Sequence, residues 1–245
     1  MNFLGKKILE SVREKKTCIC GFDTFNMESA QAVARVAAEM SVPVFLQACS
    51  KSAHYMGLEM ALRILQEAKR TVGDLVCIHF DHGEQLSCVE ELKQAIRLGF
   101  ESIMVDGSSL TLQDNIALCR KIAEMAHPEG ICVEGEIGKV SRNINATREE
   151  LNRLMTDPEQ AGRLVEESGI DYLAISVGSV SGFYRKEVVL DLERLEQIRE
   201  KVSVPLVLHG GTSIPLSQVR EAIRLGVAKI NIAHGLRTAF LDGMR

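Results

Sequence analysis

The stretch AIRLGFESIMVDG, residues 95–107, contains the unit from which the fold can be worked out. Its first half has helical spacing, Gly99 suits the C-terminal cap of that helix, and SIMVD continues as an apolar strand. The pentapeptide AIRLG returns at 222–226, where VAKINIAHG follows it in the same manner. The repeat therefore indicates one helix–turn–strand module that is used twice.

Short apolar runs recur along the whole chain, and they predict eight strands. We expect these strands at residues 18–23, 42–48, 75–82, 102–107, 130–137, 171–178, 204–211 and 228–233. Most of the runs are apolar almost throughout, which is typical of strands that are covered on both faces. Helical patterns separate them, so the chain is predicted to form a single (β/α)8 TIM barrel over residues 1–245, with an N-terminal helix at 1–16 before the first strand.

The main competing architecture is an open, doubly wound sheet. No GxGxxG motif follows the first strand, so a dinucleotide-binding half has no support.

Two of the expected helices have a recognisable N-terminal sequence pattern. Ser87, with Glu90 three residues later, suits a capping box at the third helix, and Pro215 suits the first turn of the seventh.

Composition and charge exclude several classes of protein. The net charge is −4, only 4% of residues are aromatic and Trp is absent, which argues against a nucleic-acid partner. No apolar run approaches the ~18 residues of a membrane span. The first residues lack the pattern of a secretory signal. The seven cysteines include no CxxC pair and several lie in apolar runs, which favours a reducing cytoplasm.

Polar residues gather at the carboxyl ends of the expected strands, where a barrel places its active site. The third strand ends in Asp81 and His82, and the seventh ends in His209. The expected strands all end at the same edge of the barrel, and further polar residues lie near their ends. These are Asp23, Asn26, Gln47, Ser50, Asp106, Ser108, Glu134, Glu136, Ser179, Ser181, Thr212, Ser213, Asn231 and His234. We therefore expect one shared site at this end of the barrel.

Part of this set has the chemistry of a divalent-metal site. Imidazoles from His82 and His209, with carboxylates from strands three to five, suit zinc with an open position for substrate. Glycines in GSVSGFY (178–184) and HGGTS (209–213), next to a helix start, predict a phosphate cradle. Glu134 and Glu136 share one strand face and cannot both stay unpaired in a dry core, so at least one should meet a cation or a metal.

Several other residues are expected to be structural. His79 suits a hydrogen-bonded core position, His127 a helix end, and His54 the surface. Cys49 has no histidine beside it in the sequence and is expected to pack. Arg185 either reaches a phosphate or is a solvated loop charge.

Six segments in collinear order resemble the class II, metal-dependent fructose/tagatose-bisphosphate aldolases. They are VCIHFDHG, AIRLGFESIMVDGS, NIALCRKIAEMAH, VEGEIGKV, VPLVLHGGTSIP and KINIAHGLRTAF, and the likeness runs from about residue 15 to residue 241. The resemblance implies a zinc ion that polarises the carbonyl of dihydroxyacetone phosphate. It also implies an aspartate that handles the proton on the hydroxyl whose C–C bond is cleaved, a homodimer or homotetramer, and a place in carbohydrate metabolism such as glycolysis.

The resemblance assigns roles by position. Asp81 matches the aspartate, and His82 and His209 match two zinc ligands. Asp106 and Glu136 match carboxylates of an alternative, buried metal position. Gly182, Gly210 and Thr212 match the loops that bind phosphate and a monovalent cation, and Asn231 matches a residue that touches substrate. We add Asn26, Gly211 and His234 to the residues expected to bind substrate or its phosphate.

The chain departs from the family's pattern at three places. Ser181 stands where the family's strand-six loop, G-T-A-H-G-x-Y, carries its third zinc-binding histidine. The loop GKVSRNINATREE after the fifth strand has no acid among its first eight residues, where the family carries a glutamate base. In place of N-x-D-T-D after the eighth strand, the chain has Ala233 and His234, which removes an aspartate that recognises substrate hydroxyls.

Three functional hypotheses follow. In the first, metal-dependent aldol cleavage of a phosphorylated ketose survives, with Glu136, Asp106 or His234 completing the ligand set of His82 and His209. In the second, the barrel performs metal-free chemistry on a related sugar phosphate. In the third, it is a catalytically silent paralogue that binds a sugar phosphate or a partner subunit. We take the first as the main prediction.

Overall fold

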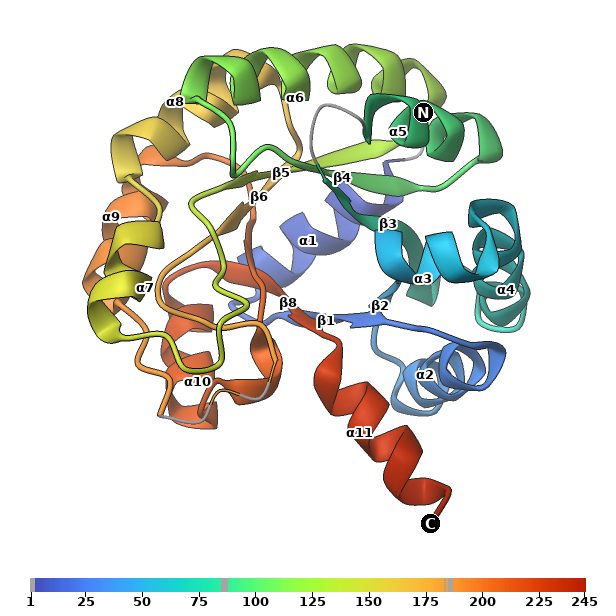
Figure 1. Cartoon of the computed structure of the whole chain (residues 1–245). Coiled ribbons are helices and arrows are strands. Elements are labelled where there is room, and N and C mark those ends of the chain that lie inside the picture. Colours follow the sequence, from blue (N-terminus) through green and yellow to red (C-terminus); the bar gives the residue numbers. More distant parts are fainter. Residues whose placement is uncertain (1–2, 85–87, 183, 185–186) are drawn as a thin grey trace.

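The computed structural model describes residues 3–84, 88–182, 184 and 187–245, and it shows eight parallel strands closed into a barrel inside a ring of helices (Figure 1). The strands are β1 (Ile19–Asp23), β2 (Val44–Cys49), β3 (Val76–Glu84), β4 (Ser102–Asp106), β5 (Cys132–Ile137), β6 (Tyr172–Ile175), β7 (Leu206–Leu208) and β8 (Val227–Ile232). Each strand pairs with the next along the chain, and β8 pairs with β1. The predicted (β/α)8 barrel is confirmed.

The helices of the outer ring follow the strands. They are α2 (Met27–Met40), α4 (Leu58–Arg70), α5 (Cys88–Leu98), α6 (Leu112–Ala126), α8 (Pro158–Ser168), α9 (Leu192–Lys201) and α10 (Leu216–Arg224), and after β8 the helix α11 (His234–Gly243) extends away from the barrel. Short helices α3 (Ser50–Met56) and α7 (Arg148–Leu154) lie in the loops after β2 and β5, and single 3-10 turns lie at Gly73–Leu75, His127–Glu129 and Gly211–Ser213. None of the helices in the described ranges combines the length and hydrophobicity of a membrane span.

The two AIRLG segments end α5 and α10 as predicted. The closing glycine has a positive φ in both copies, 94° at Gly99 and 101° at Gly226, which is the backbone conformation that a glycine C-cap supplies. Pro215 is the N-cap residue of α10, one position before the predicted first turn. Ser87 and Arg185 lie outside the described residues.

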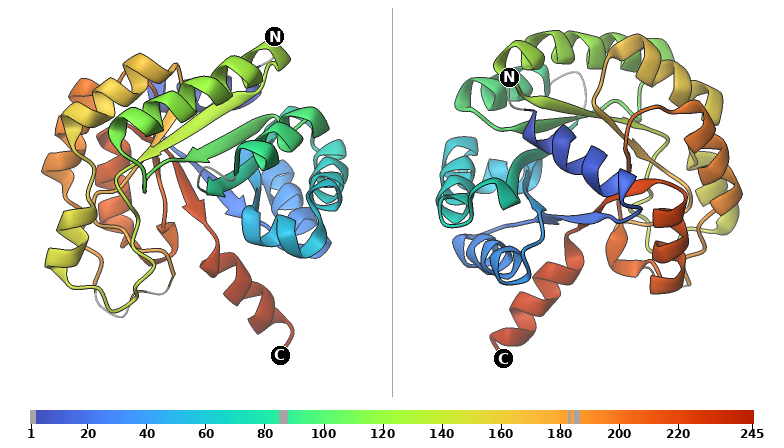
Figure 2. Two further views of the ribbon diagram at one scale, coloured as in Figure 1. Left: turned by 45° about the horizontal axis from the view of Figure 1, so that its top comes forward. Right: turned by 180° about the vertical axis from the view of Figure 1, so that it is seen from behind.

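Helix α1 (Leu4–Glu14) closes the amino-terminal end of the barrel, and Figure 2 shows it crossing that end. Its buried stripe consists of Leu4, Gly5, Ile8, Leu9 and Val12. This stripe packs against side chains that point into the bottom of the barrel, among them Phe45, Met104 and Tyr172. Because α1 closes one end, the carboxyl ends of the strands form the open mouth.

The barrel interior changes from apolar to polar toward this mouth. Cys77 on β3 and Cys132 on β5 belong to the apolar cluster under α1. Two residues further along the same strands, His79 and Glu134 lie 3.8 Å apart at their closest charged atoms and are fully buried. These two strands therefore have their apolar inward residues below and their ionisable residues above, at the level where a substrate could enter.

Candidate active site

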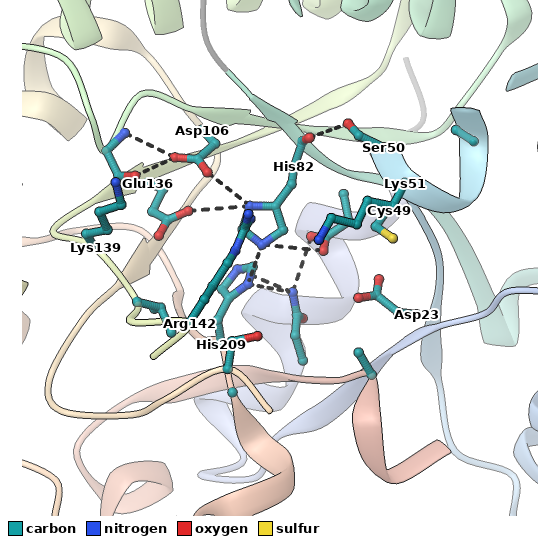
Figure 3. A pocket seen from close by; sticks show the side chains of 18 of the residues that line it. Asp23, Cys49, Ser50, Lys51, His82, Asp106, Glu136, Lys139, Arg142 and His209 are labelled. Atoms are coloured by element: carbon teal, nitrogen blue, oxygen red, sulfur yellow. Dashed lines mark hydrogen bonds and ion pairs between the residues drawn. The ribbon is translucent and has the colours of Figure 1, made fainter. Parts of the chain in front are cut away.

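The mouth of the barrel opens into a cavity of about 1750 Å³, and Figure 3 shows side chains that line it. Most residues assigned from the sequence contribute to its wall: Asp81, His82, Asp106, Glu136, Ser181, Gly182, His209, Gly210, Thr212, Asn231 and His234. Gly211 and Asn26 are not part of this wall. The strand ends thus converge as a barrel requires.

Asn26 has a helix-capping position. Its side chain accepts a hydrogen bond of 2.9 Å from the backbone N–H of Ser29, and the Ser29 hydroxyl oxygen lies 3.3 Å from the backbone nitrogen of Asn26. This capping box satisfies N–H groups at the start of α2 that have no partner inside the helix. The amide oxygen of Asn26 therefore caps this helix, and a contact of Asn26 with substrate stays a prediction.

An irregularity in β3 brings Asp81 and His82 into the mouth together. Consecutive side chains of a regular strand point to opposite faces, so one of the two would point out of the barrel. Between Phe80 and Gly83, β3 advances three residues while β4 advances two, and the register shifts. His82 has a φ of 55°, in the left-handed region that non-glycine residues rarely occupy. Bulges and strained backbone of this kind concentrate at functional sites.

His82 and His209 face each other, and a carboxylate holds each ring from behind. His82 Nδ1 lies 3.1 Å from Asp106 Oδ2, and His209 Nε2 lies 3.2 Å from Glu134 Oε1. The other two ring nitrogens, His82 Nε2 and His209 Nδ1, lie 3.1 Å apart. Because an ionised carboxylate only accepts hydrogen bonds, it keeps an N–H of each ring toward itself. Two lone pairs then face each other, and they need a proton or a metal ion between them.

The surrounding charges favour a cation at this point. Burial by itself lowers the pKa of His82, but the charge of Asp81, the hydrogen bond to Asp106 and the charge of Glu136 raise that pKa well above its ordinary value. Burial raises the pKa of Asp106, yet its hydrogen bond with His82 and the charge of that ring outweigh burial and lower it. The site is therefore a negative environment built around two imidazoles.

Glu136 is the least compensated acid of the site. Burial first, and then the charge of Asp106, raise the pKa of Glu136 well above its ordinary value. Its Oε2 atom is buried, has no hydrogen-bond partner within the described part of the chain, and lies 3.7 Å from His82 Nδ1. Buried polar atoms without partners are rare, and a bound ion is one of the explanations that such an atom calls for.

Asp81 is held as an anion. Burial raises its pKa, but the charge of His82, the interaction with His79 and the charge of His209 lower that pKa below its ordinary value. Asp81 Oδ1 accepts a hydrogen bond from Asn231 Nδ2 at 3.3 Å, and Asp81 Oδ2 lies 3.7 Å from His82 Nε2. One carboxylate oxygen is thus anchored, while the other lies beside the histidine pair.

Below the histidines, Glu134 and Lys229 form a fully buried ion pair with a distance of 2.5 Å. Lys229 Nζ also lies over the rings of Phe45 and Tyr172, 4.9 and 5.7 Å from their centroids. Burial opposes ionisation of Glu134, but Lys229 outweighs it, and the pKa of Glu134 falls to about 2. The expectation that Glu134 or Glu136 meets a cation is confirmed.

The structural assignments of the other residues also agree with the geometry. His79 is fully buried, and its Nδ1 lies 2.6 Å from the hydroxyl of Ser102. His127 pairs with Asp171 at 3.1 Å at the end of α6, and the exposed His54 pairs with Glu91 at 2.9 Å. His127 and His54 therefore have partners that account for them without a ligand, whereas His79 Nε2 has no hydrogen-bond partner in the described part of the chain and lies 3.5 Å from Asp81 Oδ1.

Three groups of side chains bring ligand atoms within 4.8 Å of one another: Asp81–His82–His209, His79–Asp81–Glu134 and His82–Asp106–Glu136. The first and third share His82 and lie on either side of its ring. With the facing lone pairs and the unpartnered oxygen of Glu136, the residues present fit a divalent metal of the imidazole–carboxylate type. Ser181 and His234 belong to none of these groups in the described ranges.

Loops after β6 and β7 and the start of α11 meet beside this centre. The Ser213 hydroxyl donates to the carbonyl oxygen of Gly182 at 2.6 Å, and the backbone N–H of Gly235 donates to Thr212 Oγ1 at 3.1 Å. A Cβ on Gly210 would lie 2.5 Å from the carbonyl oxygen of Val180, so only glycine fits there. The loops predicted to bind phosphate are therefore packed against each other at the first turn of a helix.

His234 belongs to these loops. Its Nε2 would lie 3.7 Å from a Cβ built on Gly182, and its pKa is lowered by burial first and then by the charges of Arg237 and Lys51. The imidazole thus lies beside the glycine-rich loop after β6 and within electrostatic range of two cations.

Besides Arg97 at the end of α5, the cavity wall contains cations near strand ends that were not singled out from the sequence: Lys51, Lys139, Arg142 and Arg237. Figure 3 shows Arg142 pointing into the cavity from the loop after β5, the loop that the sequence described only by its lack of acids. The sequence could have indicated Lys51, Lys139, Arg142 and Arg237 by their position, because each lies within a few residues of a strand's carboxyl end. Arg237 also follows His234 by three residues, on the same face of α11.

This combination of fold and mouth is that of an aldolase barrel, and comparison with known proteins agrees. The sequence profile described as "Fructose-bisphosphate aldolase class-II" matches residues 4–245. The chain belongs to the class II fructose-bisphosphate aldolase family.

Individual relatives support the same conclusion. The chain is 35% identical over 242 residues to a sulfofructosephosphate aldolase of Alkalicoccus urumqiensis, with 98% of this chain and 83% of the relative covered. The crystal structure of the YdjI aldolase from Escherichia coli K12 superposes with a TM-score of 0.84 at 30% identity, covering 98% and 84% of the two chains. A fructose-bisphosphate aldolase of Campylobacter jejuni, at 24% identity with a TM-score of 0.79 and coverage of 98% and 78%, supports the fold alone.

Proposed function

We propose that the protein is an aldehyde-lyase that reversibly cleaves a phosphorylated ketose into dihydroxyacetone phosphate and an aldehyde, with zinc as the Lewis acid. The observation that carries this proposal is the pair of facing nitrogens, His82 Nε2 and His209 Nδ1, with the anionic Asp81 beside them. Membership of the class II aldolase family supports aldol chemistry. The relative named sulfofructosephosphate aldolase suggests that ketose phosphate as the first substrate to test.

We assign His82 and His209 as zinc ligands through their facing nitrogens. Glu136, proposed in place of the histidine that Ser181 replaces, lies on the Nδ1 side of His82 and would complete the set only if its side chain moved around that ring, whereas Asp81 already lies on the Nε2 side. Asp106 and Glu134 would keep the two rings in the required orientation through their hydrogen bonds. When bound, the ion supplies a Lewis acid that withdraws electron density from the substrate carbonyl, an effect worth several kcal/mol in the transition state.

Asp81 would take the proton from the substrate hydroxyl next to the bond that breaks, and return it in the reverse direction. The neighbouring imidazoles keep its pKa low, so the carboxylate is ionised and able to accept. Asn231 and His79 hold Oδ1, with distances of 3.3 and 3.5 Å, which leaves Oδ2 for the substrate. The reacting hydroxyl would therefore lie between Asp81 and the histidine pair.

The phosphate of dihydroxyacetone phosphate would bind at the loops that contain Gly182, Gly210, Gly211 and Thr212, next to His234 at the start of α11. Their mutual hydrogen bonds hold these loops ready before the substrate arrives. The monovalent cation beside the same loops stays a prediction. A fixed phosphate would orient the three-carbon unit with its carbonyl toward the histidines.

Two measurements test this proposal. After dialysis, elemental analysis should find about one zinc per chain in the wild type, and His82→Ala and His209→Ala should lose it. In D2O, the zinc-loaded protein should exchange one hydrogen of dihydroxyacetone phosphate for deuterium, visible by proton NMR without any aldehyde. Failure to bind zinc above pH ~6, where imidazole is neutral, would contradict the metal assignment, and turnover that persists in excess chelator would favour the metal-free alternative.

A second candidate function is a non-catalytic sugar-phosphate-binding protein. Two features favour it: Ser181 at the place of a ligand, and the absence of Asp and Glu from residues 138–145. This alternative predicts that dihydroxyacetone phosphate binds in calorimetry while its hydrogens do not exchange. The exchange experiment therefore separates the two candidates directly.

We also propose that the protein forms a homodimer or homotetramer and resides in the cytoplasm. Helix α11 extends away from the barrel (Figure 1), with Leu241 53% exposed and the C-cap residue Met244 63% exposed. Apolar side chains on a projecting helix suit a contact with a second copy. Light scattering coupled to gel filtration would test the oligomeric state.

A further inference from the structure

We propose that Asp23 and Gln47 are positioning residues for Asp81. Together with Asn231 they form a hydrogen-bonded chain that begins at a proton on Asp23 and ends at the Asp81 carboxylate. Neither the metal centre nor the phosphate loops give Asp23 and Gln47 a role. This inference deepens the proposed aldol function and rests on it, because Asp81 is the residue assigned to the proton of the reacting hydroxyl.

The chain crosses three neighbouring strands of the barrel. Asp23 ends β1 and is the register partner of Gln47 on β2, while Asn231 on β8 is the partner of Gly21 on β1. The side chains of Asp23, Gln47 and Asn231 are all buried, and Asp23 and Asn231 also line the cavity. Figure 3 shows Asp23 on the opposite side of the histidine pair from Glu136. The chain therefore connects one wall of the mouth with the reacting centre.

Two amide oxygens in this chain have no donor. Gln47 Nε2 lies 3.3 Å from Asp23 Oδ1, and Asn231 Nδ2 lies 3.3 Å from Asp81 Oδ1. Gln47 Oε1 and Asn231 Oδ1 are buried, and neither has a hydrogen-bond partner in the described part of the chain. Both lie against Gly21, where a Cβ would be 1.7 Å from Gln47 Oε1 and 2.5 Å from Asn231 Oδ1. Two buried acceptors are thus neighbours, an arrangement that costs free energy.

Rotation of one amide group supplies the missing donor. The two ends of an amide are nearly the same size, so Gln47 can exchange the places of Oε1 and Nε2 without displacing a neighbour. Nε2 then faces Asn231 Oδ1, and Oε1 faces Asp23. An ionised carboxylate could not pair with that oxygen, because it only accepts hydrogen bonds, whereas a protonated carboxyl donates its O–H. The hydrogen bonds of the chain are therefore complete only when Asp23 carries a proton.

Asn231 cannot supply this donor by rotating its own amide. The rotation would turn Asn231 Oδ1 toward Asp81 Oδ1, and the lowered pKa of Asp81 keeps that carboxyl an anion that only accepts. The orientation of Asn231 is thus fixed by Asp81, and that of Gln47 has to follow it.

The charges around Asp23 agree with a proton there. Burial first and then the charge of Asp81 raise the pKa of Asp23 to about 7, while the charges of His82 and Arg237 oppose this shift. Burial and then the charge of Asp23 raise the pKa of Cys49, the thiol on the same wall, so Cys49 stays neutral. Both protonation states of Asp23 are therefore accessible near neutral pH, and they correspond to the two orientations of the amide.

The protonated state holds Asp81 more firmly. With a donor at its oxygen, Asn231 keeps Nδ2 on Asp81 Oδ1 and leaves Oδ2 to the substrate hydroxyl. When Asp23 ionises, Gln47 turns back and the two amide oxygens face each other without a donor. Cleavage, which uses Asp81, should therefore weaken as Asp23 loses its proton, whereas hydrogen exchange of dihydroxyacetone phosphate does not use Asp81 and should not follow this titration.

The test divides kcat/KM for cleavage by the enzyme-dependent exchange rate of dihydroxyacetone phosphate, with zinc-loaded protein at each pH. The ketose phosphate is sulfofructose phosphate or fructose bisphosphate, whichever is cleaved faster. In the wild type we expect the ratio to fall about 5–10-fold between about pH 6 and pH 8.5, the loss of one buried hydrogen bond between neutral groups. Changes in folding or metal content that affect both reactions cancel in the ratio.

Two variants separate the chain from other titrations. In Asp23→Asn, the new amide donates to Gln47 Oε1 at every pH, so the ratio should stay high and level. Gln47→Met keeps the length of the side chain but breaks the chain, so the ratio should be low and level. Asp74→Asn, at an exposed acid on the amino-terminal side of β3, is the matched control and should show the wild-type fall.

NMR of the Gln47 side-chain amide follows the same event without turnover. Its signals are identified by their loss in Gln47→Met. In zinc-loaded wild type they should shift with the midpoint at which the ratio falls, and in Asp23→Asn they should not respond to pH over this range.

A level wild-type ratio, or the same fall in Asp23→Asn as in the wild type, would overturn the inference. So would a ratio that depends on sodium or potassium ions instead of pH, since the two amide oxygens would then hold a cation. Exchange with a level ratio retains the aldolase and removes the chain. An amide that titrates with Asp23 in a protein without exchange retains the chain and removes the aldolase.

Discussion

Lys229 Nζ lies 2.5 Å from Glu134 Oε2 in the barrel interior, and neither side chain is exposed to solvent. The other oxygen of Glu134 lies 3.2 Å from His209 Nε2. One carboxylate therefore links a buried lysine to a ring that we assign to the metal. The pair has both a structural and a positioning role, and the two can be measured separately.

Lys229→Met should destabilise the fold by about 3–5 kcal/mol, because it leaves the charge of Glu134 buried without its partner. Urea unfolding of the metal-free protein gives this free energy. The double variant Lys229→Met/Glu134→Gln removes both charges and should recover a large part of the loss. Equal instability of the single and double variants would mean that the ion pair does not account for the effect.

Asp106→Asn should weaken zinc binding about 10–100-fold, because Asp106 holds the Nδ1–H of His82 and so keeps the opposite lone pair toward His209. Competition with a chelator of known affinity measures the change. Asp74→Asn, an exposed position on the amino-terminal side of β3, is the control and should bind zinc as the wild type does. Wild-type affinity in Asp106→Asn would argue against carboxylate control of the ring.

Gly210→Ala should damage the phosphate loops beyond the cost of backbone strain. Gly210 and Gly169 have nearly the same positive φ, 75° and 74°, but a Cβ on Gly210 would meet the carbonyl oxygen of Val180 at 2.5 Å, whereas a Cβ on Gly169 meets nothing within 4 Å. Strain alone should cost both variants about 1–3 kcal/mol. We expect only Gly210→Ala to lose binding of dihydroxyacetone phosphate in calorimetry, and equal binding by the two variants would remove Gly210 from the site.

Stability should decline at alkaline pH through buried thiols. Burial raises the pKa of Cys132 from 9.0 to about 12, and burial followed by the charge of Cys20 raises that of Cys18 to about 11. The folded protein holds these protons more tightly than the unfolded chain does. Their contribution is therefore complete below the unfolded pKa and is lost as the pH rises through the folded values.

Urea unfolding between about pH 8 and pH 10.5 measures this decline. Cys132→Ala removes one of the groups, so its free energy of unfolding should fall less steeply with pH than that of the wild type. Comparison of slopes cancels the packing cost of the substitution and the titration of lysines and tyrosines that both proteins share. Parallel slopes would show that Cys132 does not contribute.

The strands could be predicted because strands covered on both faces are apolar almost throughout, and because glycine caps such as Gly99 and Gly226 mark where helices end. The site could be located because a parallel barrel brings all its strand ends to one mouth. Asn26 shows that a residue near a strand end can also have a structural role. A polar residue after a strand can cap the next helix, and the sequence signal of a cap is the same as that of a site.

Other features depend on contacts that only the closed barrel creates. The sequence required a cation for Glu134 or Glu136 but could not choose Lys229, which lies 95 residues from Glu134 along the chain. The bulge at His82 depends on how β3 pairs with β4, which the sequence of β3 alone does not encode. Arg237 is an ordinary helix residue until α11 is placed against the wall with Phe25.

A metal ion between His82 Nε2 and His209 Nδ1 is the feature on which most of these expectations depend. Crystals grown with zinc, with diffraction recorded on both sides of the zinc absorption edge, would locate the ion directly. We predict an anomalous peak ~2.0–2.1 Å from both nitrogens, with a carboxylate oxygen completing the set. A fully occupied zinc bound away from both histidines, or no peak at saturating zinc above pH ~6, would contradict it.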